Sequence, residues 1–479
     1  MTTSNQPQPP TPTADGEPPG KKLRSLFHHV DFRWLWIGDT ASQLGAAFGG
    51  LAIPYLAVTA LGASEFQMGM LGTLTTLGFL IIGLPSGALI DRWRKRNIMI
   101  IADFGRAALL VTLPIAWWTG WLTFAQVAIV ATLVGMLQVF FDVSYQSYLP
   151  TLVHSDQVVE GNSKLQASQS VSQAAGPALG GLLIKVAGAS WSIAINAVGY
   201  LASAVTLLRI KHRETPPTPA ERRPLVTEIG EGLRFVVRHP LLRRLIACTG
   251  IGNLFNSVGQ VLTVYYMVQL LHLSALTIGI IESVAALGGL AGALVITKLS
   301  RTIGEGPSII VTTFSMVVFG FGWVVAWYLP AVPVLLVFQS LGFASIVAYN
   351  IATVSFRQRL CPPKLLGRMN ASARFLIWGT MPIGSFIGGV LGRNLGTVPT
   401  LWVSAAGGAL ALLPVVFSPL WRLRTLPDHR DGGSAVPGQP KPTDDDRLDE
   451  LAAVGEFTNL GPVDGSVITE SPGASPRTG

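Results

Sequence analysis

A basic turn between two apolar stretches decides how this chain folds: it reads GLPSGALIDRWRKRNIMII over residues 83–101. Four of the six residues from 91 to 96 are Arg or Lys, and apolar residues lie on both sides. Hydrocarbon favours apolar side chains and strongly disfavours charged ones. The stretch therefore predicts two membrane-crossing helices joined by a short loop at the membrane surface.

The composition of the whole chain agrees with a membrane protein. Of its 479 residues, 49% are hydrophobic and only 13% are charged, whereas soluble domains carry about 25% charged residues. The net charge of +8 comes from basic residues in short loops and not from a basic domain, so we expect no nucleic-acid partner. The two cysteines, Cys248 and Cys361, lie far apart and predict neither a disulfide framework nor a metal site.

Long apolar stretches recur along the chain. A helix needs about 20 apolar residues to cross a bilayer, and stretches of that kind predict an all-α polytopic membrane protein with about twelve transmembrane helices. The stretch 164–187 is unusually polar at its start, so one of its sides must face protein or water. The predicted helices are 33–60, 66–90, 97–119, 122–143, 164–187, 189–209, 242–270, 275–298, 307–328, 331–353, 370–394 and 398–421.

The basic residues predict the orientation. If the N-terminus is cytoplasmic, the internal loops 91–96, 144–163, 210–241, 299–306 and 354–369 hold four, none, six, one and four Lys or Arg. The short external loops hold none. Because cytoplasmic loops carry the excess of basic residues, we expect both termini in the cytoplasm of a bacterial cell, with the chain in its plasma or inner membrane.

The chain divides into two similar halves with tails and a linker. We expect a disordered cytoplasmic tail at 1–30, six-helix bundles at 31–209 and 242–421, and a disordered cytoplasmic tail at 422–479. The linker 210–241 contains an amphipathic helix from Pro224 to Arg238, which should lie on the membrane surface or pack under the bundle. Similar Gly- and Pro-containing motifs recur in the fifth and eleventh helices, and a parallel repeat of this kind places a binding site between the halves.

The turn after the second helix resembles a family signature. Gly87, Asp91, Arg92, Lys95 and Arg96 match the loop motif of the major facilitator superfamily, although Arg94 stands where that family usually has glycine. The resemblance implies the major facilitator fold of two six-helix bundles.

It also implies that this corner is a conformational latch. In the family the corner contacts the start of the eleventh helix and the end of the fourth while the cytoplasmic side is closed. We therefore expect Asp142 to meet Arg92 or Arg96, unless the basic cluster serves only as a positive-inside anchor.

Further motifs are similar to one branch of that family. Residues 103–106, 162–181 and 367–389 resemble the branch that contains macrolide efflux proteins and the enterobactin exporter. This resemblance implies export of a small, partly apolar drug, antibiotic or siderophore-like product, with proton antiport and alternating access. Gly176 and Pro177 resemble part of the motif of drug/proton antiporters and, with Pro382, are candidate helix bends, or plain packing kinks.

Charged residues inside predicted helices are candidates for proton coupling. Burial disfavours a charged carboxylate, so a buried acid can exchange protons near neutral pH. Asp39 and Glu282 have no adjacent base and suit this role best, although Glu282 could merely face water. Asp103 lies three residues before Arg106 on the same helix face, so the two predict a structural charge pair, with Asp103 as the next proton-coupling candidate.

The superfamily arrangement that the resemblance implies places the first, fourth, seventh and tenth helices around the pore. Polar and aromatic residues on these helices, with Arg374 on the eleventh, are therefore candidates for the substrate cavity or for hydrogen bonds between helices. They are Gln43, Gln138, Asn253, Asn256, Gln260, Tyr265, Tyr349, Asn350 and Arg374. Nucleotide-binding and hydrolase motifs are absent, so we expect no enzyme, cofactor or metal. We expect a monomeric secondary transporter whose partners are protons, lipid and a small substrate. The alternatives are a proton-coupled importer on the same fold and, from another class, a channel or membrane-embedded enzyme.

Overall fold

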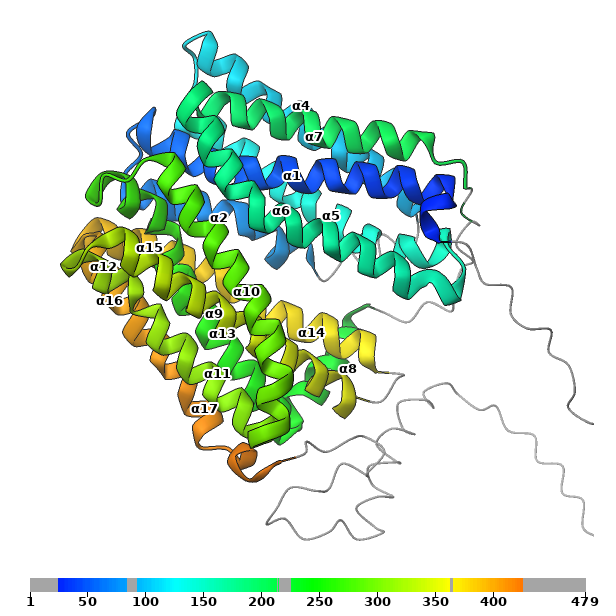
Figure 1. Ribbon diagram of the computed structural model, residues 1–479, viewed down its shortest axis with the longest axis vertical. Coiled ribbons are helices and arrows are strands. Elements are labelled where there is room, and N and C mark those ends of the chain that lie inside the picture. The colour runs from blue at the N-terminus through cyan, green and yellow to red at the C-terminus, as the bar shows by residue number, and fades with distance from the viewer. Residues whose placement is uncertain (1–24, 84–92, 213, 215–224, 362–364, 425–479) are drawn as a thin grey trace, which may run out of the picture. The chain divides into compact units, whose positions relative to one another are not determined.

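The computed structural model describes residues 25–83, 93–212, 214, 225–361 and 365–424, which belong to one compact unit of the chain. All regular structure in these residues is helical, as the sequence predicts (Figure 1). The first half follows a short 3₁₀ turn, η1 (Leu26–His28). Its helices are α1 (Val30–Thr59), α2 (Glu65–Ile81), α4 (Lys95–Trp118), α5 (Phe124–Leu152), α6 (Val158–Ala187, after the turn η2 at Ser155–Gln157) and α7 (Ala189–Arg209).

The second half has the same number of membrane-crossing segments, several of them broken into shorter helices. They are preceded by α8 (Leu225–Arg238) in the linker. The segments are α9 (Pro240–Tyr265) with η3 (Tyr266–Leu270); α10 (Ala275–Ile303); α11 (Glu305–Gly320) with α12 (Gly322–Tyr328); α13 (Ala331–Leu360); α14 (Leu366–Trp378) with α15 (Thr380–Leu395); and α16 (Thr397–Gly408) with η4 (Ala409–Ala411) and α17 (Leu412–Val416), before the turn η5 (Pro419–Arg422).

Ten helical segments in the described part of the chain are long and apolar enough to cross a membrane. Two further predicted spans fall outside that set for different reasons. The described part of α2 is only 17 residues long, because the end of its predicted span lies outside the described residues. By contrast, α6 has 30 residues but is too polar in its first half, which is the property noted in its sequence. With these two, the number of membrane-crossing segments is the predicted twelve.

The two halves contact each other mainly through α2 with α15 and through α6 with α10. Glycines allow these close approaches. A Cβ atom on Gly69 would lie 2.2 Å from the Cα of Gly389, and one on Gly279 would lie 2.1 Å from the carbonyl oxygen of Pro177. These contacts lie near the ends of the helices that are joined by the loops predicted to be external.

The predicted helix bends at Pro177 and Pro382 differ in outcome. The eleventh segment is interrupted at Gly379, between α14 and α15, three residues before Pro382. In contrast, α6 continues through Gly176 and Pro177 as one helix. Beside this proline, the backbone N–H of Ala178 donates a 2.9 Å hydrogen bond to Ser283 Oγ of α10. The Gly176–Pro177 motif therefore lies at a contact between the halves.

The linker helix α8 packs against α14, which decides between the two placements left open by its sequence. Val236 is buried in a cluster with Met369, Ala373 and Ile377 of α14. An ion pair between Glu231 and Arg368 holds the same two helices together. The linker helix is therefore attached to α14, the N-terminal part of the eleventh membrane segment.

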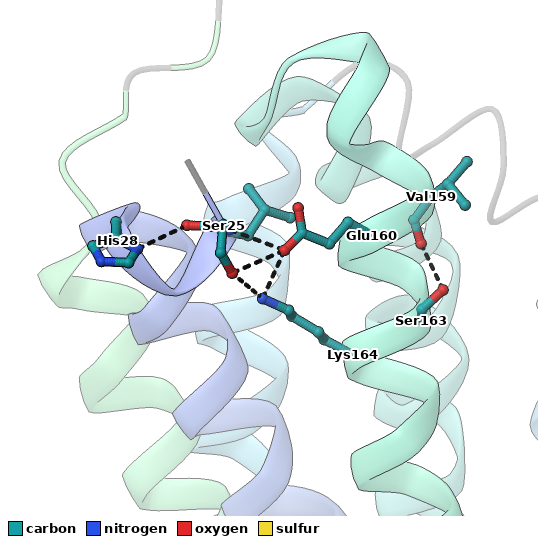
Figure 2. Close-up of polar contacts among 7 residues, drawn as sticks. Ser25, His28, Val159, Glu160, Ser163 and Lys164 are labelled. Carbon is teal, nitrogen blue, oxygen red and sulfur yellow. Dashed lines mark hydrogen bonds and ion pairs between the residues drawn. The ribbon is translucent and has the colours of Figure 1, made fainter. Parts of the chain in front are cut away.

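The N-terminal boundary differs from the expectation of a disordered tail up to residue 30. Ser25 Oγ and the backbone N–H of Leu26 both donate to the Glu160 carboxylate on α6, and Lys164 pairs with Glu160 and donates to Ser25 (Figure 2). The side chain of Leu26 is fully buried. The last six residues of the predicted tail are therefore part of the folded unit, because an apolar anchor and an ion pair hold them.

Candidate functional site

A polar cavity of about 650 Å³ lies in the first half, among α1, α5, α6 and α7. Cavities of this size hold drug-sized ligands. Its lining combines carboxylates, amides, hydroxyls and aromatic rings. The lining residues are Asp39, Ser42, Gln43, Ala46, Gln138, Phe141, Asp142, Tyr145, Gln146, Asn162, Ser163, Leu165, Gln166, Gln169 and Tyr200. Four of them, Asp39, Gln43, Gln138 and Asp142, are among the predicted site residues.

Asp39 is the most isolated acid of the cavity. It lies nine residues into α1, about 14 Å from the N-terminal end of that helix at 1.5 Å per residue, and is only 4% exposed. Tyr145 and Gln43 are within hydrogen-bonding reach of its carboxylate. Among the described residues, nothing donates a hydrogen bond to Asp39 Oδ2. A buried carboxylate oxygen without a donor is costly, so this atom is suited to accept a proton or a ligand's donor group.

Behind the cavity wall, Arg106 of α4 joins two acids into one network. Its guanidinium is only 1% exposed and pairs with Asp103, which is 0% exposed, so the predicted charge pair is present. The guanidinium also donates to Gln138 Oε1, and Gln138 Nε2 donates to Asp142 Oδ1 at 2.7 Å.

Two aromatic rings hold the Arg106 guanidinium in place. Its carbon lies 4.4 Å from the centre of the Phe141 ring and 4.1 Å from that of Tyr200. Contact with two ring faces adds a cation–π attraction on each side. The Arg106 charge is therefore held in place and neutralised by Asp103. The only carboxylates among the residues that line the cavity are Asp39 and Asp142.

The predicted latch residues are only partly described. Gly87, Asp91 and Arg92 lie outside the described residues. Arg96 donates to the carbonyl oxygens of Leu207 and Leu208 at 2.9 and 3.0 Å, at the end of α7. The Lys95 ammonium donates to the Ser147 carbonyl.

Asp142 bonds to Gln138 rather than to Arg96, so the structure does not bring this predicted pair together. Arg96 is held by the α7 carbonyls because a helix C-terminus attracts a cation. The contact expected when the cytoplasmic side is closed stays a prediction.

Glu282 lies on another surface, on α10 in the second half. Its side chain is exposed, and it does not line the first-half cavity. At 100° per residue, it lies roughly opposite the exposed apolar stripe of Ile280, Leu287 and Leu294. It therefore faces away from the side of α10 that is suited to lipid, between the surfaces that contact α6 and α13.

The candidates in the second half divide into exposed, bridging and buried residues. Asn256, Gln260 and Asn350 are exposed. Asn253 donates to the Ile377 carbonyl of α14 at 3.3 Å and thus bridges two helices. Tyr265 is within hydrogen-bonding reach of Glu65 on α2.

Tyr349 and Arg374 make contacts that their positions in the sequence do not predict. Tyr349 is only 3% exposed and hydrogen-bonds Thr249 at 2.8 Å and Cys248 at 3.4 Å, so of its two expected roles the structure shows the hydrogen bond between helices. These hydrogen bonds link α13 to α9. Arg374 of α14 instead reaches across to the first half, donating to Gln146 Oε1 at 3.4 Å beside the polar cavity.

Several lining residues were not predicted. The sequence predicts a loop at Tyr145 and Gln146, because the predicted fourth helix ends at 143, but α5 continues to Leu152. Gln166 and Gln169 belong to the polar start of α6, and this polarity was the signal that could have placed them at the cavity. Within the described residues, no group of three or more His, Cys, Asp or Glu side chains is arranged to hold a metal ion.

Comparison with known proteins identifies a family. A profile of the Major Facilitator Superfamily matches residues 35–379. "Enterobactin exporter EntS" of Citrobacter koseri is 24% identical over 435 residues, which cover 86% of this chain and 97% of that protein. The protein of the same name from Salmonella typhimurium is 24% identical over 436 residues, covering 86% and 98%.

Solved structures of transporters share the fold. A bacterial homologue of the iron transporter ferroportin in an inward-facing state gives a TM-score of 0.68 at 16% identity, covering 81% of this chain and 98% of that one. The nucleoside transporter NupG gives 0.64 at 12% identity, covering 81% and 98%. At these identities, the similarity establishes a common architecture.

Proposed function

This chain belongs to the Major Facilitator Superfamily, and on that premise we propose that it is a secondary transporter that exports a small, partly apolar molecule in exchange for protons. The family and the named relatives make it a multi-pass membrane transporter rather than an enzyme. The name of its relatives as exporters supports the direction.

The buried, unpartnered oxygen of Asp39 in the polar cavity is the observation that carries the proposal. An antiporter needs a group that binds either a proton or its substrate, but not both. Asp39 suits this role because it lines a space of drug-like size and one of its carboxylate oxygens, Oδ2, is buried without a donor. Asp142 offers a second carboxylate, tied to the Arg106 network through Gln138.

The lining also favours a class of ligand. Phe141 and Tyr145 stack at 5.9 Å with their planes 15° apart, and offer an apolar surface beside the carboxylates. Amide side chains from α5 and α6 can accept or donate hydrogen bonds. A molecule with an apolar body and a protonated amine or other donor group fits this surface best.

Contacts between the halves support alternating access. With both termini in the cytoplasm, the close contacts of α2 with α15 and of α6 with α10 lie toward the outside, and the arrangement corresponds to an inward-facing state. A cysteine replacing Ser64 should then react with an impermeant reagent added to intact cells, and one replacing Thr302 should not. Labelling of Thr302→Cys would show that the chain has the opposite orientation in the membrane. The native cysteines are both buried and give a low background.

Proton-driven flux in proteoliposomes tests the proposal. We would load vesicles with a pH-sensitive dye, impose a pH gradient and add ethidium as a cationic probe. Wild-type protein and the surface control Asp156→Asn should both couple ethidium movement to proton movement, whereas Asp39→Asn should lose the coupling. The variant Glu282→Gln, measured separately, tests whether the acid on α10 is needed for proton coupling. If Asp39→Asn and Glu282→Gln both keep full proton coupling, the coupling residue is neither of these acids, and Asp103 becomes the next candidate.

Import by the same fold is the second candidate function. A nucleoside transporter has the same architecture, so the fold allows either direction. Uptake into cells that is driven by an inward proton gradient and abolished by Asp39→Asn would favour the importer.

A further inference from the structure

A second cavity, of about 590 Å³, lies where α4 begins and α7 ends. It shares no residue with the polar cavity described above. Its lining is basic, with one acid and a buried apolar side chain. The lining residues are Arg94, Arg96, Asn97, Ile210, Lys211, His212 and Glu214.

Three lining cations outnumber one carboxylate, and two of the cations are free to bind. Arg94 and Lys211 are exposed, and neither side chain has a hydrogen-bond or ion-pair partner within the described part of the chain. Arg96 is fixed by the α7 carbonyls. Glu214 accepts a 3.2 Å hydrogen bond from the Arg96 backbone N–H. The lining therefore keeps an excess of positive charge.

The floor of this cavity is held rigidly. The Asp31 carboxylate of α1 accepts hydrogen bonds from the backbone N–H groups of Lys211 and His212 at 3.1 and 3.0 Å. Ile210, which directly precedes them, is buried in an apolar cluster that includes Phe32 and Leu207. Because Asp31 engages backbone rather than side chains, it fixes the Lys211 position without pairing its ammonium. The cations are thus presented by an ordered segment.

Exposed apolar side chains continue from the cavity along both helices. On α7 they are Val198, Leu201, Val205 and Leu208, at three- and four-residue steps. On α4 they are Ile101, Phe104, Val111 and Ile115, at steps of three, seven and four residues. Spacing of this kind puts each set on one face of its helix. Since α4 and α7 pack together, both stripes end close to the basic cavity. A basic cavity at the end of two apolar stripes matches the two parts of a lipid.

We propose that this cavity binds the phosphate of an anionic phospholipid head group, with the acyl chains along the stripes of α4 and α7. Arginine presents a planar fork that suits phosphate oxygens, and basic pockets at the cytoplasmic membrane surface bind anionic head groups. The same cations could bind free phosphate, but free phosphate would make no use of the apolar stripes. The lipid would tie the start of α4 to the end of α7.

Lipid binding to purified full-length protein tests the inference. We would measure binding of phosphatidylglycerol and of phosphatidylcholine, together with the shift in unfolding temperature that each causes. Wild type should bind phosphatidylglycerol more tightly and gain stability from it. The double variant Arg94→Gln/Lys211→Gln should bind about thirtyfold more weakly, because two attractive charges are gone. Arg96 stays unchanged, because its replacement would also remove the cap of α7.

The matched control removes the same charge from the same predicted membrane surface. Lys298 and Arg301 are exposed at the inner end of α10 and do not line the cavity. The variant Lys298→Gln/Arg301→Gln should bind phosphatidylglycerol as wild type does. Equal losses in both double variants would show general surface attraction and overturn the proposal. Stabilisation by inorganic phosphate, with no preference between the two lipids, would overturn the lipid as the occupant.

Discussion

The Asp103–Arg106 pair gives the sharpest test of the buried network. Replacing Arg106 by Met removes a charge-assisted hydrogen bond to Asp103, a hydrogen bond to Gln138 and two cation–π contacts. It also leaves the Asp103 carboxylate, 0% exposed, without its counter-charge. Breaking one partner of a buried pair typically costs about 3–5 kcal/mol. We therefore expect Arg106→Met to lower the free energy of unfolding by about 3–5 kcal/mol.

The double variant separates this cost from lost packing. Asp103→Asn/Arg106→Met removes both charges, so no uncompensated charge stays buried. The double variant should lose less free energy of unfolding than the single variants Asp103→Asn and Arg106→Met lose together, by about 1–3 kcal/mol. The assay is reversible unfolding in mixed detergent micelles, monitored by tryptophan fluorescence.

Additive single effects, or single losses below about 0.5 kcal/mol, would refute the reasoning. Either result would mean that water reaches the pair and screens it. The control variant Asp156→Asn makes the same Asp-to-Asn change at the surface, and its free energy of unfolding should stay within about 0.5 kcal/mol of wild type.

Three further predictions concern contacts between segments. Lys164 and a backbone N–H hold the pKa of Glu160 below its usual value, so the attachment of the N-terminal turn should be fully present above about pH 4.3 and be lost as the pH falls through the lowered pKa. Hydrogen exchange at the Leu26 amide should accelerate on acidification and in Glu160→Gln at neutral pH; an unchanged rate in Glu160→Gln would contradict the role of this acid. Gly279→Ala places a methyl group 2.1 Å from a carbonyl of α6 and should lower the unfolding temperature or separate the halves, whereas Gly320→Ala, with nothing within 4 Å, should do neither. We also propose that Asp91→Asn expresses normally but transports poorly, with its population shifted toward the inward-facing state; unchanged spin-label distances between the second and eleventh helices, alongside lost transport, would reject the latch.

Much of the architecture could be predicted because the signals are local. A stretch of apolar residues long enough to cross a bilayer is visible without knowing its neighbours, and the described helices follow the predicted spans. The Asp103–Arg106 pair was equally accessible, because residues three apart on a helix always share a face.

The site was only partly accessible, because its members come from different helices. Sequence placed Asp39, Gln43, Gln138 and Asp142 inside helices, and the structure brings all four to one cavity. Tyr145 was missed because hydropathy falls where a helix leaves the membrane, although the helix itself continues.

The sequence by itself determined the helical spans, the basic loops and the acids within the membrane, since hydropathy and helical period are properties of neighbouring residues. Only the tertiary structure decided which faces meet. Tyr349 and Gln43 are both polar residues within predicted spans, yet one is buried against α9 and the other lines the cavity. The rotation and tilt of each helix against its neighbours make that difference, and they are set by packing between residues far apart in the chain.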